Sequence, residues 1–232
     1  MKKIKNPMIR RIPKELIGDW KKYLVVFLFL VLTIGFVSGM YVANESMITS
    51  ANEGVIKYKQ EDGHFELKKQ ADATLLSAIE TGEKADFKAT KTTLYENFFR
   101  NEEEDYNNDG KKDGTIRVFA KTKDINLACM LQGSFPQKAD EIAIDRMHAD
   151  NVGIKVGDTV TVSGETYKVV GLLAYVNYST LHEKTTDLMF DALKFDVAMV
   201  TQDGFDRLHK SIHYTYAWKY ETEPADEAGE KT

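Results

Sequence analysis

An uncharged stretch of 21 residues, from Tyr23 to Ala43, constrains the fold of this chain more than any other feature. It reads YLVVFLFLVLTIGFVSGMYVA, and a helix of this length, at about 1.5 Å per residue, is about 30 Å long. The hydrocarbon core of a bilayer has about the same thickness, roughly 30 Å. The sequence therefore predicts a transmembrane helix over residues 23–43, which divides the remaining residues between two compartments.

The charges beside this helix predict its orientation. Residues 1–22 carry eight basic and two acidic side chains, a net charge of +6, whereas the whole chain carries −5, which leaves −11 on the remainder. Positive charge next to a span stays cytoplasmic, so we expect residues 44–232 to be extracytoplasmic. A cleaved signal peptide is the competing interpretation. Its apolar region would span only about 7–15 residues and end at a small-x-small site, and Ser38 to Tyr41 show no such pattern.

The basic arm, residues 1–22, has a pattern of its own. Apolar side chains recur there at helical spacing: Ile12, Leu16, Ile17, Trp20 and Leu24. This pattern predicts an amphipathic helix in the cytoplasmic headgroup layer, and Pro13 suits its first turn. The residues expected to anchor it at the membrane interface are Trp20, Lys21, Lys22 and Tyr23. The alternative is that these charges only set the topology.

Residues 54–232 are numerous enough to form one sizeable domain or two small ones. Their acidic balance excludes nucleic acid as a partner, because that binding needs clustered lysine and arginine. The chain has one cysteine, Cys129, so it forms no intramolecular disulfide, and the LACML setting predicts a small core residue. Residues 223–232, EPADEAGEKT, have almost no apolar content and are expected to be a solvated tail.

A helical stalk is expected to join the span to this domain. Met40, Ala43, Met47 and Ala51 continue a helical stripe to about Asn52, and Gly54 offers a stop. The predicted stalk therefore covers residues 44–53.

Strands and short helices alternate through the rest of the chain. The patterns predict strands at 64–67, 92–100, 115–121, 141–145, 158–164, 166–176, 195–201 and 212–220. They predict helices at 70–82, 146–153 and 202–210, the second closed by Gly153. The fold class is therefore an α+β extracytoplasmic domain carried by a single N-terminal transmembrane helix with a helical stalk.

A segment rich in acidic residues, EEEDYNNDGKKDG, lies between two of the predicted strands. Asp105, Asn107 and Asp109 alternate, as in the opening half of an EF-hand calcium loop, and Asp113 stands at the ninth position. The twelfth position is Ile116, where an EF-hand needs a bidentate glutamate, so an ordinary EF-hand is excluded. Two interpretations remain, a calcium loop on a hairpin and a plain exposed turn, and the missing ligand favours the turn.

No catalytic motif is evident. The sequence contains no G-x-S-x-G, Walker A, G-x-G-x-x-G or H-E-x-x-H pattern, so we expect no enzyme activity, and ATP, if it drives this protein, binds to another chain. His209 and His213 have the spacing of a metal pair, but they lie at an expected helix-to-strand junction where a shared face is lost. Within the span, Gly35 and Gly39 form a small-xxx-small pair that predicts either a helix-packing face or tolerated glycines.

The ordered combination of these parts resembles a known family. The opening NPMIRRIPKELIGDWKKYLVVFLFLVLTIGFVSGMYVANESM and the block DEIAIDRMHADNVGIKVGDTVTVSGETYKVVGLL, from Asp140 to Leu173, resemble FtsX-like, MacB-type ABC transporter permeases. GDTVTV, from Gly157, and KVVG, from Lys168, are the most recognisable pieces. The resemblance implies that residues 54–222 are a MacB-like core domain, and that the chain works with a separate cytoplasmic ABC ATPase and forms a homodimer.

The resemblance also implies a mechanical role. ATPase-driven motion would pass through the first span and stalk to an outer domain that meets a peptide, lipoprotein or cell-envelope partner.

Members of the family continue into at least three further membrane helices, whereas this chain ends at Thr232. We therefore expect a truncated or split permease, its other spans on another chain, or a one-span relative. The alternative function is a single-pass surface protein whose outer domain binds a ligand or calcium.

Overall fold

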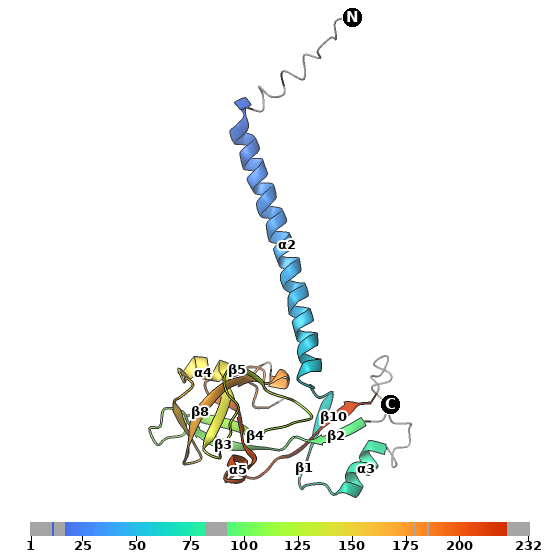
Figure 1. Ribbon diagram of the computed structural model, residues 1–232, viewed down its shortest axis with the longest axis vertical. Helices are drawn as coiled ribbons and strands as arrows, with labels where there is room; N and C mark the ends of the chain where they lie inside the picture. The colour runs from blue at the N-terminus through green and yellow to red at the C-terminus, as the bar shows by residue number, and fades with distance from the viewer. Residues whose placement is uncertain (1–10, 12–16, 82–91, 179, 185, 222–232) are drawn as a thin grey trace, which may run out of the picture. The chain divides into compact units, whose positions relative to one another are not determined.

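The computed structural model describes residues 11, 17–81, 92–178, 180–184 and 186–221 (Figure 1). The chain divides into two compact units, Met1–Glu53 and Gly54–Thr232, which are taken in turn. Most of the predicted interfacial helix of the arm and the predicted tail, residues 223–232, lie outside the described residues.

One long helix, α2 (Trp20–Lys57, 38 residues), contains the predicted span and stalk. It is the helix among the described residues whose length and apolar composition suit a membrane span. No proline interrupts it, and none of its residues is buried. The predicted transmembrane segment is thus helical throughout.

The predicted stop at Gly54 is wrong, because α2 continues through it to Lys57. The helix ends in a Schellman motif, in which the Gln60 N–H donates to the Val55 carbonyl (3.0 Å) and the Lys59 N–H to the Ile56 carbonyl (3.3 Å). Lys59 takes the left-handed position of this motif with a φ of 49°. Because that position is usually glycine, the local sequence predicts a helix end at Gly54 instead.

The second unit contains a small antiparallel sheet of three strands in the order β1-β10-β2. Its strands are β1 (Gly63–Leu67), β10 (Tyr214–Tyr220) and β2 (Thr92–Glu96). Helix α3 (Ala73–Thr81) lies beside β2 (Figure 1), and the Glu80 carboxylate accepts the Leu94 N–H at 2.9 Å.

Seven strands form the larger sheet, in the order β5-β8-β6-β9-β4-β3-β7. They are β3 (Phe99–Asp105), β4 (Gly114–Ala120), β5 (Cys129–Gly133), β6 (Glu141–Asp145), β7 (Thr159–Val162), β8 (Glu165–Ala174) and β9 (Phe195–Val200). Because β7 pairs with both β3 and β8, six of the strands close into a barrel, and β5 is attached outside it on β8. The pairs β4–β9 and β6–β8 are parallel, and the other pairs are antiparallel.

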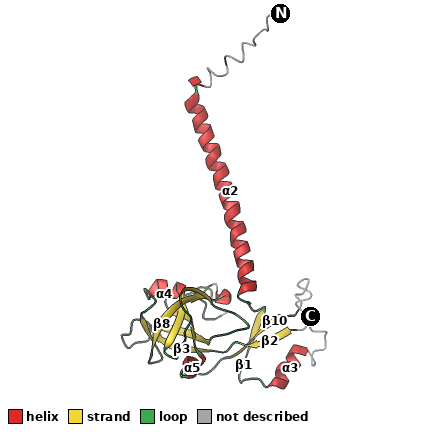
Figure 2. Cartoon of the chain, in the orientation of Figure 1, coloured by secondary structure: helices red, strands yellow, loops and turns green. Residues whose placement is uncertain are grey.

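Short helices connect these strands, as the colouring of Figure 2 shows. They are α4 (Arg146–Val152), α5 (Gln202–Asp206) and the 3-10 turn η1 (Val176–Tyr178). The Asp145 side chain caps the start of α4 by accepting the Met147 N–H, and Gly153 ends it with a φ of 83°, as predicted. Helix α5 ends four residues before the predicted end at residue 210.

Both faces of the larger sheet are buried. One set of side chains, including Ile116, Val118, Ile144 and Val160, forms one cluster, and Phe119 and its neighbours form a second. The alternation of a strand separates Val118 from Phe119 in this way. All six residues of β9 are buried, as expected for a strand covered on both sides.

The predicted α+β class is confirmed, with two differences in the strands. The predicted strand at 92–100 is two strands in different sheets, because the chain leaves the small sheet at Asn97 and Phe98. Strand β5 was not predicted, and Cys129 at its start is half-buried on an edge strand rather than in the core.

Candidate functional site

The segment that follows α2, residues 58–62, is fixed to the outer domain, and we call it the joint. The loop that precedes β5 supplies two backbone donors to it. The Leu127 N–H donates to the Tyr58 carbonyl at 2.8 Å, and the Asn126 N–H donates to the Lys59 carbonyl at 3.0 Å. The chain is therefore held from its first residue after the helix.

Side chains strengthen the same contact. The Asn126 side chain, 3% exposed, accepts the Glu61 N–H through Oδ1 (3.0 Å) and donates through Nδ2 to Glu61 Oε2 (2.6 Å). The Tyr58 hydroxyl donates to Cys129 Sγ at 2.8 Å. One buried amide thus satisfies both the backbone and the side chain of Glu61, which fixes the conformation of the joint.

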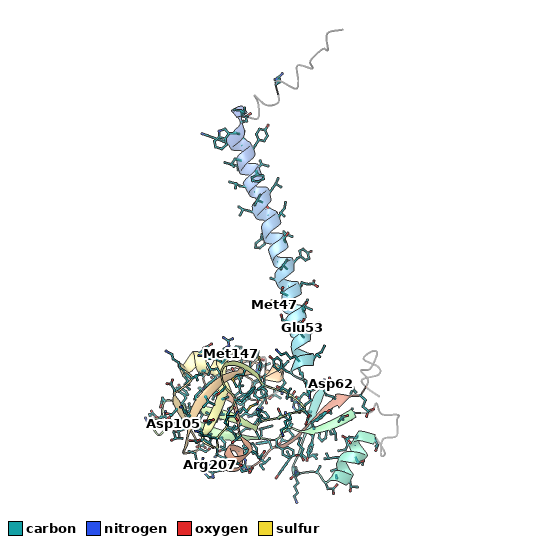
Figure 3. All side chains as sticks on the ribbon, viewed as in Figure 1. Met47, Glu53, Asp62, Asp105, Met147 and Arg207 are labelled. Carbon is teal, nitrogen blue, oxygen red and sulfur yellow. The ribbon has the colours of Figure 1, made fainter. Side chains whose placement is uncertain are left out.

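The small sheet holds the joint from another direction. The Asp62 N–H donates to the Trp218 carbonyl (3.0 Å), and the Tyr220 N–H returns a bond to the Asp62 carboxylate (2.8 Å). Lys219 Nζ donates to the Gln60 carbonyl at 2.8 Å. Asp62 is labelled in Figure 3, where it lies beside β1 and β10. A displacement of the joint would therefore also move the small sheet and the loop before β5.

A groove of about 810 Å³ adjoins the joint, and residues of both sheets line it, including Glu61, His64 and Arg117. The Arg117 guanidinium stacks on the Phe99 ring (4.4 Å to the centroid) and donates to the Tyr178 hydroxyl (3.0 Å). The groove is thus lined by a positioned cation and by polar groups, a lining that suits a polar ligand.

Histidine–glutamate pairs line the same groove. His64 Nδ1 lies 2.7 Å from Glu61 Oε1, and His213 Nδ1 lies 2.8 Å from Glu66 Oε1. The hydrogen bond with Glu61 raises the pKa of His64 above 6.5, although burial and the charge of Arg117 act in the opposite direction. The charge of the groove therefore depends on pH, because His64 loses its proton as the pH rises through its raised pKa.

The predicted calcium residues lie on the hairpin between β3 and β4. Asp105, labelled in Figure 3, accepts the N–H groups of Asp109 (3.1 Å) and Gly110 (2.9 Å) through its two carboxylate oxygens. Asn107 Oδ1 also accepts the Asp109 N–H, and Asp113 Oδ2 accepts the Tyr106 N–H (3.2 Å). The Asn107 bond is that of an Asx turn, whereas the bonds of Asp105 and Asp113 reach further along the hairpin. Calcium binding by Asp105, Asn107, Asp109 and Asp113 stays a prediction.

A second polar cluster is buried inside the domain. It consists of Glu104 on β3, His148 on α4 and Asp196 on β9, each 0% exposed. One side-chain ligand atom from each lies within 4.8 Å of the others, and His148 Nε2 is 3.3 Å from Glu104 Oε1. Among the described residues, this is the group of histidine, cysteine and carboxylate side chains that could hold a metal ion.

The protonation of this cluster reflects burial and charge together. Burial favours the neutral ring, but the charges of Asp196 and Glu104 outweigh it and raise the pKa of His148 to about 9. Burial also raises the pKa of Asp196 well above its ordinary value, while His148 acts to lower it. The buried cluster therefore stabilises a positive charge beside its carboxylates.

The predicted membrane residues lie on α2. Trp20 and Tyr23 are about half exposed, and Lys22 forms an ion pair with Asp19 at 3.0 Å. Gly35 and Gly39 have open space beside them. The anchoring role of Trp20, Lys21, Lys22 and Tyr23 and the packing role of the glycines stay predictions.

Sequence reasoning missed both the joint and the buried cluster. Asn126 stands in an ordinary loop sequence, and its partner Glu61 is distant in the chain. Glu104 lies in the acidic run EEED, which is typical of a solvated turn. Alternation along the strand places Glu102 and Glu104 together on the face opposite to Phe99, but no local pattern shows that this face is buried.

No protein-family model matches this sequence, and no curated protein matches it either. Solved structures do match. The extracellular domain of the noncanonical ABC-type transporter YknZ from Gram-positive bacteria is 12% identical, with a TM-score of 0.36, over 72% of this chain and 88% of that one. The periplasmic region of MacB from Actinobacillus actinomycetemcomitans is 9% identical, with a TM-score of 0.37, over 66% of this chain and 68% of that one.

The first is an extracellular domain and the second a periplasmic region of its protein. Because both TM-scores are below 0.5, we draw no functional conclusion from the likeness.

Proposed function

We propose that this chain is the anchor helix and outer domain of an ABC transporter permease, and that it couples a separate cytoplasmic ATPase to an extracytoplasmic partner. Its substrate would be a peptide, a lipoprotein or a cell-envelope component. The chain would have no enzyme activity of its own, and its N-terminus would lie in the cytoplasm.

The unbroken helix α2 is the observation that carries this proposal. Its 38 residues make a rod of about 57 Å, of which residues 44–57 extend about 21 Å beyond the predicted span. Every turn inside a helix is closed by backbone hydrogen bonds, so such a rod transmits a displacement along its axis. A flexible linker at the membrane surface would absorb the same displacement.

The joint provides the point at which this displacement would enter the outer domain. Residues 58–62 contact β10 in the small sheet, and they contact the loop before β5 and Cys129 at the start of β5. A push on the joint would therefore act on the two sheets together, and it would act on the groove that both of them line.

The partners in this proposal follow from the sequence resemblance. They are a cytoplasmic ABC ATPase, further permease spans and a second copy of this chain. The open sides of Gly35 and Gly39 suit close contact with another membrane helix. The lipid bilayer surrounds the apolar side chains of the span.

Affinity purification of the tagged full chain from mild detergent, with mass spectrometry of the bound proteins, tests the proposal. We expect an ABC ATPase and a polypeptide with the further spans to be recovered. A matched variant, Gly35→Leu with Gly39→Leu, should recover less of the other membrane polypeptide, and Ser38→Leu on the same helix serves as the control. Recovery of the intact chain without any ATPase would contradict the proposal.

A single-pass surface protein is the second candidate, and the groove favours it. Arg117, His64 and His213 bring cationic or titratable groups to one hollow of about 810 Å³. If ligand binding is the function, Arg117→Gln should abolish binding of that ligand while the chain purifies without an ATPase. Recovery of the ATPase would decide for the permease.

A further inference from the structure

We propose that Glu104, His148 and Asp196 bind one divalent transition-metal ion of the zinc type inside the outer domain. The site does not depend on the permease function, and it is separate from the predicted calcium loop.

Burial and orphaned atoms are the first support. All three side chains are completely buried, and four of their polar atoms have no hydrogen-bond partner: Glu104 Oε1, Glu104 Oε2, His148 Nε2 and Asp196 Oδ2. Buried polar atoms are nearly always paired, so a group of four facing one another needs an explanation. A bound cation satisfies all four at once.

The remaining atoms of the cluster are already used in ways that orient metal ligands. His148 Nδ1 donates to the Ala192 carbonyl at 2.7 Å, which directs Nε2 toward the carboxylates. A metal-binding histidine usually makes such a bond through its other nitrogen. Asp196 Oδ1 accepts the Val197 N–H (2.7 Å) and the Asp145 N–H (3.2 Å), which leaves Oδ2 for the ion.

The distance between the His148 and Glu104 side chains fits a small ion. Zinc binds imidazole nitrogen and carboxylate oxygen at about 2.0–2.2 Å, so neighbouring ligands in a tetrahedron lie about 3.3–3.5 Å apart. His148 Nε2 and Glu104 Oε1 are 3.3 Å apart. Both Glu104 oxygens are without a hydrogen-bond partner, so Glu104 can bind the ion through one oxygen or through both as a bidentate ligand.

The charge balance indicates a divalent ion. With the ion bound, two carboxylates and an imidazole that has released its proton would balance a charge of +2. Within the described ranges no lysine or arginine makes a hydrogen bond or ion pair with Glu104 or Asp196. The imidazole donor favours zinc and related transition metals over calcium or magnesium, which prefer oxygen alone.

Such an ion would have a structural role. Its ligands come from β3, α4 and β9, so it would join the helix to two strands of the barrel. All three side chains are completely buried, and a site closed to solvent is typical of structural rather than catalytic zinc. The Tyr106 ring packs edge-on against His148 (5.9 Å between centroids), so the ion would also stiffen the start of the β3–β4 hairpin.

The experiment uses the purified full chain in detergent. The chain is stripped with a chelator, incubated with Zn²⁺, passed over a desalting column and analysed for metal content and melting temperature. We expect one zinc per chain and a higher melting temperature than in the stripped chain. Co²⁺ in place of Zn²⁺ should give the visible absorption bands of a low-symmetry site.

Two variants test which residues bind the metal. Glu104→Gln should weaken zinc affinity at least about tenfold, whereas His64→Gln with His213→Gln, which removes two groove histidines, should leave it unchanged. If Glu104→Gln does not fold, Asp196→Asn and the Co²⁺ spectrum of the parent give the answer. The proposal is overturned if the folded parent retains no metal and NMR shows both ring nitrogens of His148 protonated at pH 7. It is also overturned if the groove variant alone loses the metal.

Discussion

At the residue scale, one buried amide organises the joint. The Asn126 side chain bonds to both the N–H and the carboxylate of Glu61, and it is almost completely buried. Replacing it with alanine leaves the Glu61 donor and carboxylate without these partners. We expect Asn126→Ala to lower the free energy of unfolding by about 1–3 kcal/mol.

Denaturant unfolding of the full chain in detergent, followed by the fluorescence of Trp218, measures this effect. The matched control is Gln202→Ala, which removes an exposed amide bonded only to Asp206 and should change stability by less than about 0.5 kcal/mol. Equal effects of the two substitutions would show that Asn126 does not hold the joint.

A second residue, His64, makes the stability of the joint depend on pH. Its folded pKa is raised above 6.5 by Glu61, so the protonated ring stabilises the fold. This contribution is fully present below about pH 6.5, the unfolded pKa, and is lost as the pH rises through the folded value. Melting temperatures between pH 5.5 and 8.5 should therefore fall less steeply for His64→Gln than for the parent. Parallel curves would mean that His64 does not contribute.

At the element scale, two glycines with similar positive φ values separate strain from crowding. Gly133 in β5 and Gly153 after α4 have φ values of 77° and 83°. A Cβ at Gly133 would lie 2.2 Å from the Val170 carbonyl oxygen, whereas a Cβ at Gly153 would meet nothing within 4 Å. Both positions have a positive φ, but only Gly153 has room for a side chain.

Alanine at Gly153 should therefore cost only the left-handed conformation, about 1–2 kcal/mol. Alanine at Gly133 should cost more, because β5 must move away from β8 to admit the methyl group. Thermal unfolding of both variants tests this order. A smaller loss for Gly133→Ala than for Gly153→Ala would show that β5 is held loosely.

The same scale shows which elements local sequence predicts. Strands β6, β9 and β10 follow the expected β-branched and aromatic patterns. Helix α4 begins after a typical N-cap residue, Asp145, and ends at a typical C-cap residue, Gly153. Strand β3, FRNEEED, does not follow these patterns, because it directs carboxylates inward toward groups from other parts of the chain. Glu102, for example, accepts bonds from the Lys210 N–H and the Ser163 hydroxyl.

At the scale of the whole molecule, the features that escaped prediction all depend on distant pairings. The barrel closes because β7 pairs with both β3 and β8, and no local pattern reports that closure. The joint and the buried cluster likewise unite residues from separate elements. The transmembrane helix and the overall α+β class were predictable because length, charge and periodicity within one segment suffice for them.

Charge also predicts which side of the membrane each unit occupies. The +6 arm should remain in the cytoplasm, so an alkaline phosphatase fused after Thr232 should be active and a fluorescent protein fused there should be dark. The matched variant replaces the eight basic residues of the arm with glutamine, which removes the asymmetry while keeping the span. It should lower phosphatase activity per molecule and raise fluorescence, because part of the population inserts in the opposite orientation. Fluorescence from the parent fusion would contradict the predicted topology, because it would mean that the groove, the joint and the buried cluster lie in the cytoplasm.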